Sequence, residues 1–187
     1  MKYFIESLFF RIPNSIKSRF KILIYRFLGA RIGKKNRFEK GLLRRATQIE
    51  ITDHNTFTST YKLWPEDTAF SGKRIIIGSY NYFNKNMMLD ACGMIQIGDY
   101  NMFGPDVYIT DSNHTFGDGI SPQKAPMQRG KVKIGNHCWI GAKTIILKDV
   151  ELGDYCVVGA GSVVTKSFPN GSIIGGVPAK HLSKKTE

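Results

Sequence analysis

The fold is decided by residues 134–166, which read IGNHCWIGAKTIILKDVELGDYCVVGAGSVVTK. An aliphatic residue occupies every sixth position of this stretch. These positions are Ile134, Ile140, Ile146, Leu152, Val158 and Val164. An amphipathic helix would repeat near every 3.6 residues and a half-buried antiparallel strand every second residue, so neither fits. A sustained period of six predicts a parallel β-helix.

The geometry of such a helix explains the spacing. Six residues form one flat side and its corner, three sides close a coil, and successive coils stack at roughly 4.8 Å. The repeating aliphatic side chains then fill the interior. We expect the pairs Gly135-Asn136 and Gly153-Asp154 to lie at corners, because these residue types tolerate turn conformations.

The same register continues upstream with interruptions. Two further triplets follow it, with a two-residue slip around Gly93 between them. They are Ile77, Phe83 and Leu89, then Ile97, Phe103 and Ile109. Ile32-Gly33 and residues 49–57 resemble degraded earlier coils. The period disappears after Ile109, so residues 111–133 are predicted to be a long loop leaving the β-helix, a kind of excursion that usually carries function.

Composition indicates one domain with short appendages. The chain has 187 residues, of which 42% are hydrophobic, enough for one core. We expect a basic amphipathic helical segment at 1–30, a β-helix domain at 31–182 and a tail at 183–187. The net charge of +12 is concentrated in residues 1–45, which hold 13 Lys and Arg against Glu6 and Glu39. Because the rest of the chain is nearly neutral and no recognised module is present, nucleic-acid binding is not expected.

The basic N-terminal segment has two interpretations. It caps the first coil as an amphipathic helix, or it also contacts an anionic membrane face. Its apolar runs are shorter than the roughly 18 residues that span a bilayer, and no signal-peptide cleavage site follows them. Three cysteines without paired spacing favour a reduced, cytoplasmic protein, at the inner face of the membrane if the second interpretation holds.

From Gly29 to about Leu182 the chain resembles the hexapeptide-repeat acyltransferases. The resemblance lies with the galactoside and maltose acetyltransferases and with the O-acetyltransferases of capsule, colanic-acid and lipopolysaccharide biosynthesis. Its most specific parts are residues 134–141, residues 159–166 and the segment Gly175–Lys180. It implies a left-handed parallel β-helix, acetyl-coenzyme A as acetyl donor, a homotrimer with sites between subunits, and a sugar hydroxyl as acceptor. Polysaccharide biosynthesis is the expected role.

The resemblance also implies site residues. His114 lies where the family keeps its catalytic histidine, and a histidine suits proton transfer at neutral pH. Asp111, Asn113 or a main-chain carbonyl could fix its tautomer. Asn84, Asp90 and Asp111 are expected at the acceptor. The galactoside enzymes have an acidic residue where this chain has Cys92, and the offset Asp90 favours the polysaccharide branch.

Two groups of residues are implied for coenzyme A. Those beside the pantetheine arm are Trp139, Gly141, Ala142, Gly159 and Ala160. Those near phosphate and adenine are Thr165, Lys166 and Lys180. Ordinary coil packing is the alternative for the two alanines, and a solvated charge is the alternative for the two lysines. The cysteines fall at packing positions, which favours direct attack over an acetyl-enzyme.

Other functions remain as alternatives. An N-acetyltransferase of an amino sugar, or a serine or xenobiotic acetyltransferase, would place the same demand on His114. A γ-type carbonic anhydrase would need three histidines around zinc. The four histidines of this chain lack the required spacing, so no metal site is predicted.

Overall fold

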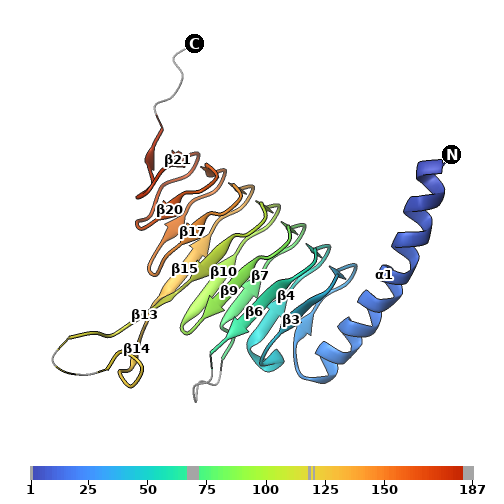
Figure 1. Cartoon of the computed structure of the whole chain (residues 1–187), viewed down its shortest axis with the longest axis horizontal. Helices are drawn as coiled ribbons and strands as arrows, with labels where there is room; N and C mark the ends of the chain where they lie inside the picture. The colour runs from blue at the N-terminus through green and yellow to red at the C-terminus, as the bar shows by residue number, and fades with distance from the viewer. Residues whose placement is uncertain (1, 67–71, 118, 120, 183–187) are drawn as a thin grey trace, which may run out of the picture.

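The computed structural model is an α-helix followed by a solenoid of short strands (Figure 1). It describes residues 2–66, 72–117, 119 and 121–182, with side chains described from residue 15 onward. The expected tail at 183–187 lies outside the described residues. The solenoid is the left-handed parallel β-helix that the repeat and the resemblance predicted.

Three sheets form the sides of the prism, and they are parallel throughout except for the last strand pair of the second sheet, which is antiparallel. Sheet A contains β1 (Arg31–Ile32), β4 (Ile49–Ile51), β7 (Ile75–Ile77), β10 (Met94–Ile97), β15 (Lys131–Ile134) and β18 (Glu151–Leu152). Sheet B contains β2 (Arg37–Phe38), β5 (Thr56–Phe57), β8 (Tyr82–Phe83), β11 (Met102–Phe103), β16 (Trp139–Ile140), β19 (Val157–Val158), β21 (Ile173–Gly175) and β22 (Lys180–His181). Sheet C contains β3 (Gly41–Leu43), β6 (Tyr61–Pro65), β9 (Met88–Ala91), β12 (Tyr108–Thr110), β17 (Ile145–Ile146) and β20 (Val163–Val164). A 3-10 turn, η1 (Ala46–Gln48), precedes β4.

The interior is built from the predicted six-residue register. All six aliphatic residues from Ile134 to Val164 are at most 1% exposed, and the two upstream triplets are at most 2% exposed. Sheet B adds a ladder of aromatic rings in which Phe38, Phe57, Phe83 and Phe103 stack at centroid separations of 4.4 to 4.8 Å. Each coil therefore buries its apolar side chains against the coils above and below.

The corners differ from expectation in which residue takes the turn conformation. The left-handed backbone falls on His137 (φ 56°) and Tyr155 (φ 58°), not on Gly135-Asn136 or Gly153-Asp154. Glycine is required at 135 for another reason, because a Cβ there would lie 2.7 Å from the backbone nitrogen of Asp154 in the next coil. The predicted location of these corners was right, and the assigned cause was wrong.

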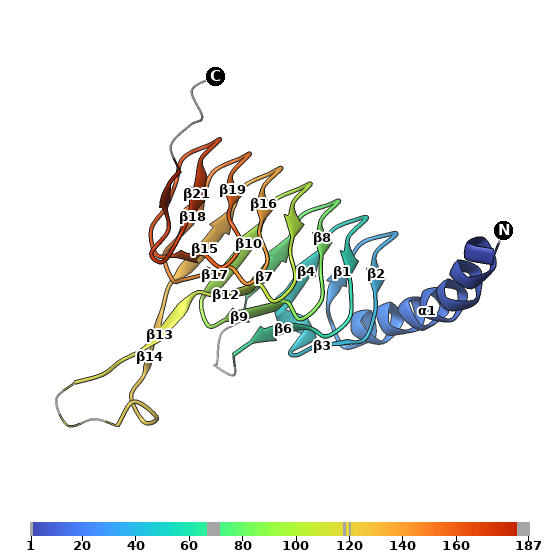
Figure 2. The same ribbon diagram turned by 45° about the horizontal axis from the view of Figure 1, so that its top comes forward.

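Helix α1 (Lys2–Phe27) packs its C-terminal part beside the first coil and extends away from the β-helix toward its N-terminus (Figures 1 and 2). Ser18 Oγ accepts a hydrogen bond of 2.8 Å from the backbone N–H of Phe38, and Tyr25 packs edge-on against the Phe38 ring. Arg26 donates to the carbonyl oxygens of Ile32 and Gly33. The C-terminal half of α1 is thus the cap on the open end of the β-helix.

The excursion after Ile109 is an arm that stands out from the corner between sheets C and A (Figure 2). Its root is an antiparallel hairpin of β13 (Ser112–His114) and β14 (Met127–Arg129). The chain rejoins the solenoid at Lys131, which pairs with Met94 as part of β15. The predicted loop boundary at 133 was therefore wrong, because residues 131–133 continue the sheet A ladder and bury Val132.

Candidate active site

Most of the predicted site residues lie at the two corners that flank sheet C, and Asp90, Trp139 and Lys180 lie on strands beside these corners. One corner column, where sheet B turns into sheet C, contains Asn84, Gly141 and Gly159, since the N–H at each position bonds to the next coil in the same way. The other corner, where sheet C turns into sheet A, carries the arm with His114. The chain therefore presents the two groups on opposite edges of one sheet.

His114 is exposed near the root of the arm, and its ring is oriented by the arm itself. Nδ1 lies 3.2 Å from the carbonyl oxygen of Pro122. A neutral imidazole that donates from Nδ1 to this carbonyl leaves the Nε2 lone pair free to accept a proton. Of the three orienting groups considered from sequence, the structure selects a main-chain carbonyl.

Asp111 anchors the arm from inside the fold. Its carboxylate is fully buried and accepts hydrogen bonds from the backbone N–H of Cys92 at 2.7 Å and of Gly93 at 3.0 Å. Burial raises the pKa of Asp111 to about 6, against the opposing effect of these two donors. Because both oxygens serve the turn at Cys92-Gly93, Asp111 positions the arm from beneath.

Asp90 lies on the outer face of sheet C, on the same edge as the arm. Tyr108 donates its hydroxyl to Asp90 Oδ2 at 2.8 Å, and desolvation raises the pKa of the Asp90 carboxyl. Trp64 is its register neighbour on β6, and the Arg44 guanidinium lies 4.6 Å from the Trp64 ring. A half-buried carboxylate beside an aromatic ring is a suitable surface for a polar acceptor.

The corner column between sheets B and C has little side-chain bulk. A Cβ at Gly141 would lie 2.5 Å from the backbone nitrogen of Ala160, so glycine is needed for the coils to approach. At Gly159 the nearest atom to a Cβ is 3.5 Å away, and Ala160 is exposed. Trp139 flanks the column from sheet B and is 56% exposed. This strip of small residues beside an indole ring fits a narrow, extended ligand.

The three residues expected near phosphate and adenine separate. Lys180 pairs with Gly175 at the edge of sheet B, next to the small-residue column. Thr165 and Lys166 follow β20 and lie at the other corner, on the side of the arm. Both lysines are exposed, and Lys166 Nζ lies 5.6 Å from the centre of the Phe168 ring.

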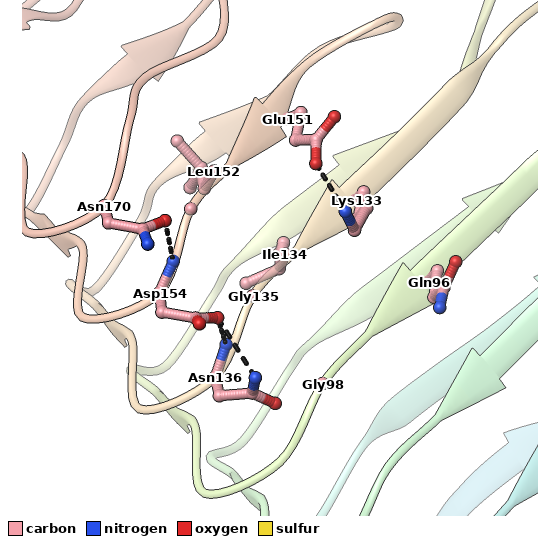
Figure 3. A pocket seen from close by; sticks show the side chains of 11 residues that line it. Gln96, Gly98, Lys133, Ile134, Gly135, Asn136, Glu151, Leu152, Asp154 and Asn170 are labelled. Atoms are coloured by element: carbon pink, nitrogen blue, oxygen red, sulfur yellow. Dashed lines mark hydrogen bonds and ion pairs between the residues drawn. The ribbon is translucent and has the colours of Figure 1, made fainter.

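A pocket on the outer face of sheet A lies away from all these residues (Figure 3). Its floor is a polar ladder in which Asn136 N–H donates to Asp154 Oδ1 at 2.7 Å and Asp154 N–H donates to Asn170 Oδ1 at 2.9 Å. An ion pair between Lys133 and Glu151 closes one side. These polar groups are hydrogen-bonded or ion-paired with one another, so we assign them a structural role at the corner between sheets A and B.

Cysteine and metal chemistry find little support in the part of the chain that the structure describes. Cys92, Cys138 and Cys156 are all buried. Burial raises the pKa of the Cys92 thiol and raises that of Cys138 to about 11, which disfavours a thiolate nucleophile. Among the residues that the structure describes, no group of three or more His, Cys, Asp or Glu lies close enough together to hold a metal ion.

Sequence reasoning missed two contributors to the site. They are the Pro122 carbonyl in the arm and the Tyr108 hydroxyl on the outer face of sheet C. Tyr108 could have been found from the register, because it stands one position before the buried Ile109 and so faces outward. The Pro122 contact depends on the path of the arm, which has no repeat to predict it.

Comparisons with known proteins agree with this fold. Residues 131–166 match the family described as bacterial transferase hexapeptide (six repeats). The chain is 43% identical over 110 residues to Nodulation protein L of Rhizobium meliloti (strain 1021), covering 58% of this chain and 59% of that protein. It is 36% identical over 109 residues to a galactoside O-acetyltransferase of Lactococcus lactis subsp. lactis (strain IL1403), covering 58% and 52%. The match thus spans little more than half the length of these relatives.

Solved structures share the architecture. A maltose O-acetyltransferase from Clostridium difficile 630 is 25% identical with a TM-score of 0.56, covering 88% of this chain and 74% of that one. A point mutant of AntD, an N-acyltransferase from Bacillus cereus in complex with dTDP and coenzyme A, has a TM-score of 0.69 at 23% identity, covering 84% and 85%. At that identity the second likeness concerns the fold alone.

Proposed function

We propose that this chain, whose residues 131–166 match the bacterial hexapeptide transferases, transfers an acetyl group from acetyl-coenzyme A to a sugar hydroxyl. The observation that carries the proposal is His114, exposed near the root of the arm with Nδ1 held by the Pro122 carbonyl. A galactoside O-acetyltransferase among the relatives, at 36% identity, favours a sugar hydroxyl over an amine. The acceptor would belong to a cell-surface polysaccharide or its precursor.

The corner between sheets B and C fits the donor. Gly141, Ala142, Gly159 and Ala160 would let backbone N–H groups approach the pantetheine arm, with Trp139 beside it and Lys180 near the phosphates. Bound there, acetyl-coenzyme A supplies an activated thioester. The acceptor would lie against Asp90, on the edge of sheet C that carries the arm, and against Asn84 of the partner subunit.

The proton transfers follow from the orientation of His114. Nε2 takes the proton of the acceptor hydroxyl as the hydroxyl oxygen bonds to the carbonyl carbon, and the Nδ1–H bond to Pro122 stabilises the resulting imidazolium. As the carbon–sulfur bond breaks, His114 returns that proton to the departing thiolate. No side chain is acylated, which agrees with the burial of the three cysteines and with the raised thiol pKa of Cys92 and of Cys138.

The separation of the two corners favours a homotrimer. His114 and the small-residue column lie on opposite edges of sheet C, so the arm of one protomer would meet the column of its neighbour. Thr165 and Lys166, on the arm side, would then face the phosphates from the second subunit. We expect sedimentation equilibrium to give a molecular mass three times that of one chain.

The test is thiol release from acetyl-coenzyme A with a panel of free, nucleotide-activated and lipid-linked sugars, comparing the intact protein with His114→Ala. We expect acceptor-dependent release that falls by about 10² or more in the variant. Equal release by both proteins would remove His114 from the mechanism. Release with amino sugars and none with hydroxyl acceptors would replace the O-acetyl proposal with N-acetyl transfer.

A further inference from the structure

Helix α1 has a second apolar face that nothing in the described protein covers. Ser18, Ile22 and Tyr25 turn toward the first coil. On the opposite side stands a stripe of large apolar side chains. They are Ile16 (63% exposed), Phe20 (64%), Leu23 (62%), Ile24 (40%) and Phe27 (91%). At about 3.6 residues per turn these positions form one continuous face. Burying such a stripe would release water from several large side chains at once.

Basic residues border this stripe on both sides. The helical repeat places Lys17 and Lys21 along one edge and Arg19 and Arg26 along the other. Lys17 and Arg19 are exposed, whereas Lys21 and Arg26 bind main-chain carbonyls of the first coil. The first coil adds further exposed cations beside the helix. They are Lys34, Lys35 and Lys40.

This charge is confined to one end of the molecule. Residues 1–45 hold 13 of the 27 Lys and Arg but only two of the 15 acidic residues, so the remaining body is nearly neutral. In the described residues no helix is long and apolar enough to cross a membrane. An apolar stripe bordered by basic residues is typical of a helix that lies in the plane of an anionic lipid surface.

We propose that α1 docks the protein onto an anionic membrane surface, with the Phe20 and Phe27 side chains inserted among the acyl chains. Lys17, Arg19 and the exposed lysines of the first coil then face the headgroups. Charge complementarity favours lipid over a second copy of this chain, because two such faces brought together would also bring together two strongly positive ends. The proposal depends on exposure and charge alone, so its failure would leave the transferase proposal standing.

The experiment is co-sedimentation of the full chain with neutral phosphatidylcholine vesicles and with vesicles containing about 30% phosphatidylglycerol. We expect pelleting with the anionic vesicles that weakens as salt is raised. The double variant Phe20→Ser/Phe27→Ser should lose about tenfold or more of this binding, and Lys17→Gln/Arg19→Gln should weaken it selectively for anionic lipid. Tyr155→Ser removes a comparably exposed aromatic residue at a β-helix corner and should pellet as the intact protein does.

Three results would overturn the proposal. Equal pelleting with neutral and anionic vesicles would remove the role of charge. Pelleting of Phe20→Ser/Phe27→Ser at the level of the intact protein would remove the role of the stripe. A smaller oligomer for that variant by sedimentation velocity, together with no vesicle binding by the intact protein, would assign the face to a second copy. Circular dichroism and thermal melting establish that each variant keeps α1 and the β-helix.

Discussion

Nδ1 of His114 lies 3.2 Å from the carbonyl oxygen of Pro122, so the arm that carries the imidazole also sets its orientation. The opposite ring nitrogen is left to accept a proton. His114 therefore has two roles, contact with the arm through Nδ1 and acceptance of a proton at Nε2. Substitution by asparagine keeps a donor for the first role and removes the second.

The first prediction concerns His114→Asn. The amide NH2 can still donate toward Pro122, but asparagine supplies no base. We expect kcat to fall by about 10² to 10⁴, as for His114→Ala, while the coenzyme A dissociation constant is unchanged. The melting temperature should move by no more than about 2 °C, because the residue is exposed. Activity within about tenfold of the intact protein would show that His114 acts as an anchor of the arm and not as the base.

The second prediction follows from the raised pKa of Asp111, which is about 6. A carboxyl whose pKa is higher in the folded than in the unfolded state binds more protons when folded. Its stabilising contribution is complete below about pH 4 and is lost as the pH rises through about 6. Asp111→Asn stays neutral throughout. As the pH rises from about 4 to about 6, the free energy of unfolding of Asp111→Asn should therefore increase by about 2 kcal/mol relative to that of the intact protein.

Urea unfolding at about pH 4.5 and about pH 7.5 measures this difference. Asp149→Asn serves as a control of opposite sign, because the Lys148 side chain lowers the pKa of Asp149. Parallel pH profiles for the intact protein and Asp111→Asn would mean that Asp111 keeps an ordinary pKa.

The third prediction compares two glycines of one corner column. In Gly141→Ala the new Cβ would lie 2.5 Å from the backbone nitrogen of Ala160, so the coils must separate. We expect a loss of about 1–3 kcal/mol and a melting temperature lower by several degrees. In Gly159→Ala the nearest atom is 3.5 Å away, so stability should be preserved.

The same pair tests the location of the donor. The methyl group of Gly159→Ala would project into the strip proposed for the pantetheine arm, so coenzyme A should bind about tenfold more weakly at unchanged stability. Isothermal titration calorimetry beside thermal melting separates the two effects. Unaltered affinity would move the coenzyme A arm away from this corner.

The fourth prediction concerns Tyr108→Phe. The change removes the hydroxyl that donates to Asp90 at 2.8 Å, and a hydrogen bond to a charged group contributes about 1.5–3 kcal/mol. We expect the KM for the acceptor to rise about tenfold or more, with coenzyme A affinity retained. Tyr82→Phe, on the outer face of sheet B, is the matched control. Equal KM values for all three proteins would remove Asp90 from the acceptor surface.

The sequence by itself determined the β-helix, because a six-residue period leaves one inward position per side and every coil must fill it. The six repeating aliphatic residues from Ile134 to Val164 are buried for that reason. The small residues at Gly141 and Gly159 could be predicted from the same register. The resemblance in the motifs supplied the hand, which the period does not contain. The function of the small-residue column and of His114 remains a prediction for the experiments above.

Only the tertiary structure decided how the site residues are distributed. It put His114 and the Gly141 column on opposite edges of sheet C and buried the Asp111 side chain. It also placed the left-handed backbone conformation of the corners at His137 and Tyr155. It also exposed a second apolar face on α1. The physical reason is that these features depend on contacts between segments far apart in the chain, such as Asp111 with Cys92, and on the path of an arm that obeys no repeat.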